Sequence, residues 1–126
     1  GAVPVAAALF HKLPIEGKKV VCVISGGNID VNILSRVITR GLVMSGRKAN
    51  LTIALEDKPG QLQRVAEIVS RCGSNVVSVL HDGSDPNMPI SSCFLKLTLE
   101  TRDAVQIEQI RAELTKEGFQ LVSERV

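Results

Sequence analysis

The sequence predicts an α+β protein whose larger part, residues 51–126, is a ferredoxin-like βαββαβ domain. Residues 51–56, "LTIALE", place Leu, Ile and Leu on one face of an alternating pattern, as expected of a strand with one buried face. Two later stretches repeat apolar residues at helical spacing, and each is followed by a glycine. Residues 18–25, "KKVVCVIS", are instead almost continuously apolar, which is typical of a strand covered on both faces in an α/β enzyme.

The first part of the chain, residues 1–46, has the pattern of a helix, a strand and a second helix. The Ala-rich opening predicts the first helix, and residues 18–25 predict the strand. Asn28 or Asp30 caps the second helix, which is expected to end at about Ser45. A single strand has no sheet of its own. We therefore expect this part to be a remnant of a larger α/β domain, joined to the rest by a linker at residues 47–50.

The second part of the chain predicts four strands and two helices. The expected order is a strand at 51–56, a helix from the "DKPG" turn to Gly73, strands at 75–81 and 92–100, a helix ending at Gly118, and a last strand at 119–126. This order folds into a four-stranded antiparallel sheet with both helices on one face. The other face is expected to show Ala54, Leu80, Phe94 and Val122, which is apolar enough to indicate a partner subunit.

Composition argues against several classes of partner. The formal net charge is only +2, and the chain has no Trp or Tyr and only three Phe, so neither charge nor aromatic stacking favours nucleic acid. Residues 2–10 are apolar but lack a preceding basic segment and are too short to span a bilayer. We expect no nucleic-acid partner and no membrane partner.

The cysteines and histidines show no metal-binding pattern in the sequence. Cys22, Cys72 and Cys93 are odd in number, far apart and placed in apolar runs, as expected of reduced, buried thiols in the cytoplasm. Together with His11 and His81 they offer no C-x-x-C and no other spacing of a structural metal site. The sequence therefore predicts a cytoplasmic protein without a metal.

A glycine-rich turn, Ser25-Gly26-Gly27-Asn28, joins the expected apolar strand to the helix after it. Such a turn brings backbone amides close to a ligand, although a tight turn alone also explains the glycines. The stretches "GAVPVAAALF", "GKKVVCVISGGNIDVNILSRVITRGLV" and "LETR" resemble the C-terminal portion of threonine ammonia-lyase (threonine dehydratase), a family of fold-type-II pyridoxal-phosphate enzymes.

This resemblance implies a partial cofactor site. Ser25 corresponds to the serine that faces the pyridine nitrogen of pyridoxal phosphate in the family, and Gly26, Gly27 and Asn28 shape the turn around it. The family's Schiff-base lysine and phosphate-binding loop match nothing in this chain, where the lysines at 12, 18 and 19 are ordinary strand-flanking residues. We therefore expect no catalytic residue, no bound cofactor and no activity in this chain alone.

A second turn, Asp57-Lys58-Pro59-Gly60, opens the helix after the first alternating strand. Asp57 is positioned to cap that helix or to accept an ammonium group, and the helix amides are available to an anion. The turn, the helix and the strand "GSNVVSV" resemble an ACT domain, a regulatory module of amino-acid-metabolising enzymes. The resemblance implies that Asp57, Gly60, Leu62 and Asn75 hold an amino-acid effector at an interface between two modules.

Two further features near this turn have structural explanations. His81 beside Asp82 predicts a surface pair and not an acid-base group. Residues 84–89, "SDPNMP", predict a flexible hairpin loop.

The sequence leaves open what the domain does. The first hypothesis is a regulatory part of threonine ammonia-lyase, an enzyme that converts L-threonine to 2-oxobutanoate and ammonia. In this hypothesis the domain senses isoleucine, the end product of the pathway, or valine, within a homo-oligomer that is at least a dimer. The second is a module that only assembles the enzyme and binds no small molecule. The third, a nucleic-acid binder on the same scaffold, is opposed by the low charge and the lack of aromatics.

Overall fold

A computed structural model describes residues 1–86 and 89–122 of the chain. It contains two compact units, residues 1–36 and residues 37–126. The division falls within a helix, earlier in the chain than the boundary expected after residue 46. The two units are described separately.

The first unit contains a short helix and an extended segment. Helix α1 spans Val3–Leu9, with a proline in its first turn as expected. The predicted strand at residues 18–25 is wrong, because this segment has no regular secondary structure. A strand needs a neighbour to pair its N–H and C=O groups, and no described residue provides one here.

Helix α2, Val31–Met44, begins in the first unit and ends in the second. The Asp30 carboxylate caps it as predicted, accepting hydrogen bonds from the backbone N–H of Asn32 at 2.8 Å and of Ile33 at 3.3 Å. None of its residues is buried, although its apolar side chains lie at helical spacing. Within the described residues this apolar face therefore has no covering element.

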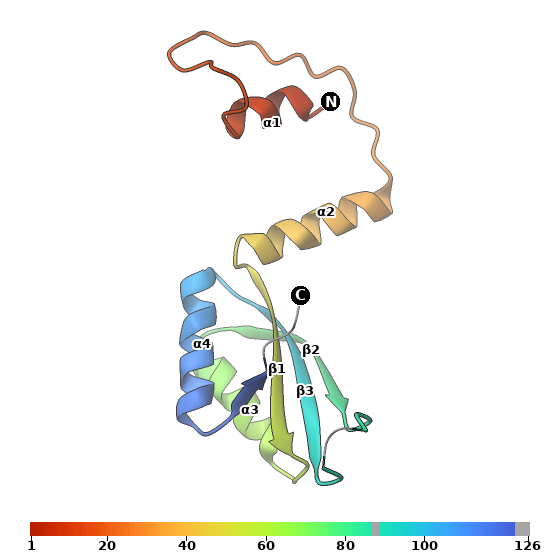
Figure 1. Ribbon diagram of the computed structural model, residues 1–126, viewed down its shortest axis with the longest axis vertical. Coiled ribbons are helices and arrows are strands. Elements are labelled where there is room, and N and C mark those ends of the chain that lie inside the picture. Colours follow the sequence, from red (N-terminus) through yellow and green to blue (C-terminus); the bar gives the residue numbers. More distant parts are fainter. Residues whose placement is uncertain (87–88, 123–126) are drawn as a thin grey trace. The chain divides into compact units, whose positions relative to one another are not determined.

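The second unit is a four-stranded antiparallel sheet with the order β2-β3-β1-β4 (Figure 1). The strands are β1 (Lys48–Glu56), β2 (Asn75–Asp82), β3 (Ser92–Glu100) and β4 (Gln120–Val122). β1 lies between β3 and β4, and β2 forms one edge. This is the predicted ferredoxin-like βαββαβ arrangement. β1 starts at Lys48, so residues 48–50 belong to the strand and not to a linker.

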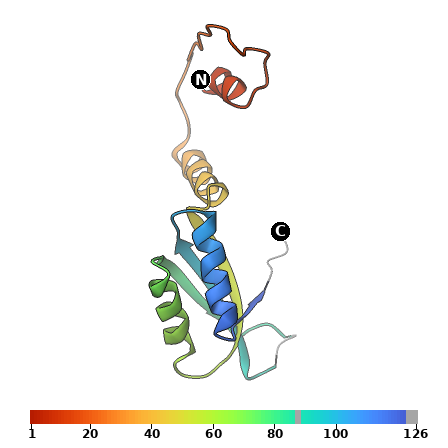
Figure 2. The same cartoon turned by 90° about the vertical axis from the view of Figure 1, so that its left-hand side faces the viewer.

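Two helices cover one face of this sheet, as Figure 2 shows from the side. Helix α3 spans Gln61–Arg71 and helix α4 spans Ala104–Lys116. Gly73 and Gly118, which follow them, have positive φ angles of 72° and 87°, which confirms the predicted glycine stops. The core between sheet and helices consists of Leu51, Ile53, Val65, Ile68, Val69, Leu95, Leu97, Leu99, Ile110, Leu114 and Phe119.

The opposite face of the sheet carries no helix of the second unit. Ala54 lies opposite Phe94 in the strand register, and Leu80 lies opposite Lys96. These residues alternate with the core residues, so they project from the uncovered face as predicted. The predicted loop at 84–89 and the predicted last strand each extend into residues outside the described part of the chain, at 87–88 and 123–126.

Candidate functional site

The Ser25-Gly26-Gly27-Asn28 turn does not form a cofactor site in this chain. All four residues are exposed. A Cβ atom added at Gly26 or at Gly27 would meet no atom within 4 Å, so the space beside both α-carbons is open. The residues present therefore do not fit pyridoxal phosphate by themselves, and no chemistry through that cofactor follows from them.

The turn between β1 and α3 contains Asp57 and Gly60, two of the predicted effector residues. Gly60 is the N-cap residue of α3, with a φ of 89°, and no side chain caps this helix. The expectation that Asp57 caps α3 is therefore wrong. Its carboxylate Oδ1 lies 3.3 Å from Nε2 of His81 instead, and its backbone N–H donates to the carbonyl of Ser91 at 2.8 Å. These contacts hold the turn against β2 and against the residue that precedes β3.

His81 and Asp82 do not form the predicted pair with each other. Alternation along β2 sends their side chains to opposite faces of the sheet, so His81 meets Asp57 while Asp82 meets Lys96 and Ser84. Asp82 accepts from the Ser84 hydroxyl at 2.6 Å and from Lys96 Nζ at 3.0 Å. The hydrogen bonds from Ser84 and then from Lys96 lower the pKa of Asp82 to about 2.

Leu62 and Asn75 complete the predicted effector set. The Leu62 side chain is 48% exposed, whereas Val65, Ile68 and Val69 form the buried face of α3. Leu62 is therefore available as an apolar contact near the start of the helix. Asn75 starts β2, where its Nδ2 donates to Glu100 Oε2 at 3.3 Å.

Asp57 and Asn75 lie at opposite ends of the sheet. Asp57 follows Glu56, which is opposite Ser92 on β3, whereas Asn75 is opposite Glu100 at the other end of β3. Eight residues of strand span roughly 26 Å. One small amino acid cannot contact both side chains within a single chain. The structure thus brings together Asp57, Gly60 and Leu62, and it separates Asn75 from them.

A pocket of about 610 Å³ surrounds Asn75 within the second unit. Three cationic side chains, those of Arg47, Lys48 and Arg102, line it beside Glu100. Such a basic pocket matches a carboxylate ligand. The sequence reasoning missed these cations, because they come from the start of β1 and from the segment between β3 and α4, and no motif links those segments.

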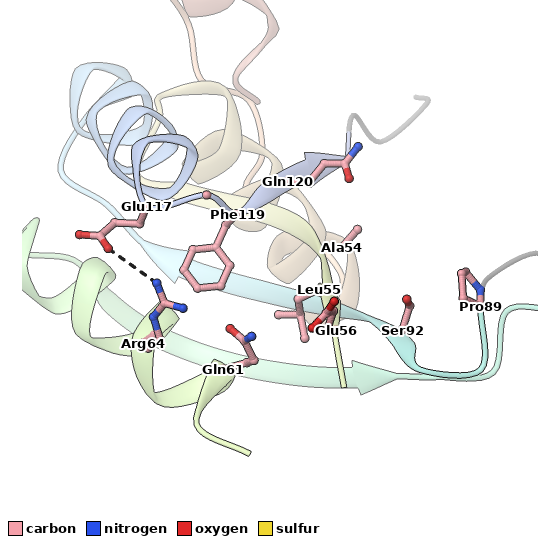
Figure 3. Close-up of a pocket in the computed structure, with 11 residues that line it drawn as sticks. Ala54, Leu55, Glu56, Gln61, Arg64, Pro89, Ser92, Glu117, Phe119 and Gln120 are labelled. Carbon is pink, nitrogen blue, oxygen red and sulfur yellow. Dashed lines mark ion pairs between the residues drawn. The ribbon is translucent and has the colours of Figure 1, made fainter. Parts of the chain in front are cut away.

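A second pocket, of about 540 Å³, lies between β1, the first turn of α3 and the α4–β4 connection (Figure 3). Arg64 lies 3.8 Å from Glu117 and 5.2 Å from the centre of the Phe119 ring. The Oε1 atom of Gln61 is buried and has no hydrogen-bond partner within the described chain. Sequence reasoning missed this pocket too, since its residues come from β1, α3, the region around the start of β3 and the α4–β4 connection, and no motif links those segments.

The class of protein that the fold and these pockets define is a ferredoxin-like α+β domain with polar sites at the ends of its sheet. No family model matches the chain. The chain is 46% identical over 121 residues to the L-threonine ammonia-lyase of Thermotoga maritima, and 39% identical over 119 residues to that of Geobacter sulfurreducens. These matches cover 96% and 94% of this chain and 30% of each relative.

A further relative is the biosynthetic L-threonine dehydratase IlvA of Lactococcus lactis, which is 41% identical over 63 residues, or 50% of this chain and 15% of the relative. The chain is thus homologous to threonine ammonia-lyases over nearly all of its own length and spans about a third of theirs. This confirms the resemblance inferred from the sequence. No described helix has the length and apolar character needed to cross a membrane.

Proposed function

We propose that this chain is the C-terminal, regulatory part of a threonine ammonia-lyase, and that residues 51–126 form an ACT domain that binds isoleucine or valine between two copies. The similarity to threonine ammonia-lyases supports the family. The predicted effector set falls into two half-sites at opposite ends of one edge strand, Asn75 at one end and Asp57 with Gly60 and Leu62 at the other, and this placement supports the interface.

That edge strand is β2, which pairs with β3 on one side only. Asn75 begins the strand, and His81, which contacts Asp57, lies near its end. If two copies pair antiparallel through β2, the twofold symmetry places Asn75 of one copy beside the Asp57–His81 pair of the other. Asp57 and Asn75 are roughly 26 Å apart within one chain, but in this dimer Asp57 of one copy lies near Asn75 of the other. The pairing creates two equal sites.

The groups at the two half-sites complement an amino acid with a small apolar side chain. Asp57 accepts hydrogen bonds from the α-ammonium group, and the basic pocket around Asn75 receives the α-carboxylate. Leu62, exposed next to Gly60, contacts the apolar side chain. An effector that bridges two copies changes their association, which is one route to an allosteric coupling of ~1–3 kcal/mol.

The whole protein, on this proposal, deaminates L-threonine to 2-oxobutanoate and ammonia with pyridoxal phosphate as cofactor. The names of the relatives support this activity. Ser25 and the turn after it would join the cofactor site only with residues from other parts of the enzyme. This chain by itself is accordingly proposed to be inactive.

The second candidate function is assembly without an effector. The exposed edge strand β2 and the uncovered sheet face favour it, because both are compatible with pairing alone. Only the first function requires a small-molecule ligand. A binding measurement therefore distinguishes the two.

The experiment is a calorimetric titration of this chain with isoleucine, and with valine and threonine for comparison. Saturable binding of isoleucine or valine is expected, with at least a tenfold loss of affinity in Asp57→Asn and in Asn75→Ala. Asn50→Ala is the matched control, because Asn50 bonds Thr98 elsewhere on the sheet. No heat and no thermal shift at millimolar ligand would leave assembly as the function.

Mixing the two variants tests whether the site is shared between chains. Each Asp57→Asn/Asn75→Ala heterodimer contains one intact site, so random mixing restores about a quarter of the binding capacity. A site formed within one chain would show no recovery. Sedimentation of each variant reports whether the dimer still forms. A variant that has lost ligand binding can then be told apart from one that has lost dimerisation.

A further inference from the structure

Three side chains that commonly bind metals meet at one end of the sheet. Asp57 follows β1, His81 is the penultimate residue of β2, and Cys93 is the second residue of β3. One potential ligand atom from each lies within 4.8 Å of the other two. In the strand register Cys93 is opposite Leu55 and His81 is opposite Leu95, so both project from the helix-covered face.

The separation of Asp57 and His81 matches shared coordination of an ion. Two ligands at about 2.0–2.2 Å from a tetrahedral ion lie roughly 3.3–3.6 Å apart. Asp57 Oδ1 and His81 Nε2 are 3.3 Å apart. The Cys93 side chain is fully buried beneath them, whereas the side chains of Asp57 and His81 are 58% and 52% exposed. The core therefore holds the thiol in place, and the two side chains beside it reach the surface, where an ion can enter.

We propose that Asp57, His81 and Cys93 form a binding site for a thiophilic divalent cation of the Zn²⁺ class. Cysteine sulfur, histidine nitrogen and carboxylate oxygen are the ligands that this ion takes, and three protein ligands leave its fourth position open to water or to an added ligand. On binding, the Cys93 thiol loses its proton to solvent and the sulfur coordinates as thiolate.

Asp82 and Glu56, the acidic residues next to this cluster in the sequence, are engaged elsewhere and do not join it as further metal ligands. Asp82 projects to the other face of the sheet, where Ser84 and Lys96 occupy its oxygens. Glu56 is paired with Lys58. No sequence motif marks the site, because its three ligands come from three strand ends, at positions 57, 81 and 93, and the antiparallel register brings them together.

The metal proposal and the effector proposal are tested separately, although both sites use Asp57. Its test needs no amino acid and no enzymatic activity. The chain, freed of metal with a chelator, is titrated with Co²⁺, a spectroscopic substitute for Zn²⁺. The expected result is one Co²⁺ per chain, with a near-ultraviolet thiolate-to-cobalt absorption band and the visible bands of a tetrahedral site, all removed by added Zn²⁺.

Variants assign the ligands. Cys93→Ser is expected to abolish the thiolate band, and His81→Gln and Asp57→Asn are expected to weaken binding at least tenfold. Cys72→Ser, Cys22→Ser and Asp82→Asn are matched controls that keep the wild-type spectrum. His81 is exposed, so His81→Gln should fold normally and tests the site even if Cys93→Ser does not fold. A wild-type spectrum without a thiolate band, a thiolate band that survives Cys93→Ser, or an unchanged Co²⁺ affinity in His81→Gln would overturn the proposal.

Discussion

At the scale of single residues, the backbone conformation of Gly46 joins α2 to β1. Its φ of 69° is in the left-handed region, and a Cβ atom built on it would lie 2.5 Å from the backbone nitrogen of Ala104. The Gly46 carbonyl also accepts the buried Thr101 hydroxyl at 2.7 Å. The glycine is therefore required for two separate reasons, its left-handed conformation and the close approach of α4.

Comparing the alanine variants of Gly46 and Gly118 separates the cost of the left-handed conformation from the cost of the close approach. Gly118 has a similar φ of 87°, but a Cβ atom there meets nothing within 4 Å. Gly118→Ala should lower the free energy of unfolding by about 1–2 kcal/mol, the cost of the left-handed conformation alone. Gly46→Ala should lose at least about 1 kcal/mol more, because α4 must also move. Urea denaturation of both variants measures the difference, and equal losses would show that α4 yields without cost.

At the scale of elements, the two helices on the sheet are connected through one buried amide. Gln106 lies in the first turn of α4 and is only 3% exposed. Its Oε1 accepts from the backbone N–H of Arg102 at 2.6 Å, and its Nε2 donates to the carbonyl of Cys72 at 2.8 Å. The Cys72 carbonyl lies at the end of α3, where no helical partner exists, and the Arg102 N–H lies just before the N-cap residue of α4. The side chain thus stabilises the start of α4 and the end of α3 together.

Gln106→Leu should therefore lower the free energy of unfolding by about 2–4 kcal/mol, because it leaves two backbone groups without partners in a partly buried site. Gln109→Leu on the same helix is the control, since Gln109 is exposed and the change should have almost no effect. Chemical denaturation measures both. If Gln106→Leu were as stable as the wild type, water would have to reach both helix ends.

Elements that depend on a local pattern were predictable from the sequence, and those that depend on a neighbour were not. β1 and β3 alternate clearly and form as expected. Residues 18–25 are equally apolar but form no strand. Within the described part of the chain they have no neighbouring strand with which to pair their backbone groups. The same distinction holds for the candidate site. The turn at Asp57 was predictable from its own residues, whereas its contacts with His81 and Cys93 depend on the strand register.

At the scale of the whole molecule, the surface of the sheet domain offers two places for a partner. One is the uncovered sheet face with Ala54 and Phe94, and the other is the edge of β2, where Val77 and Leu80 are both exposed. An edge strand with exposed apolar side chains is prone to pair with another copy. Pairing through the edge, and not through the face, would bring the two half-sites together, so the edge is the interface that the effector proposal requires.

Charge on this edge should prevent the pairing. The double variant Val77→Lys/Leu80→Lys puts two cations on exposed positions of β2, so the fold should be retained while like charges oppose association across the twofold axis. Sedimentation velocity over a range of concentrations should show a monomer, whereas the wild-type chain is expected to be a dimer. Val105→Lys, at an exposed apolar position on α4, should leave the dimer intact.

Co²⁺ binding should also persist in the monomer, because all three proposed ligands belong to one chain. A double variant that remained dimeric would exclude the edge of β2 as the interface, and the shared site of Asp57 and Asn75 would then lose its structural basis.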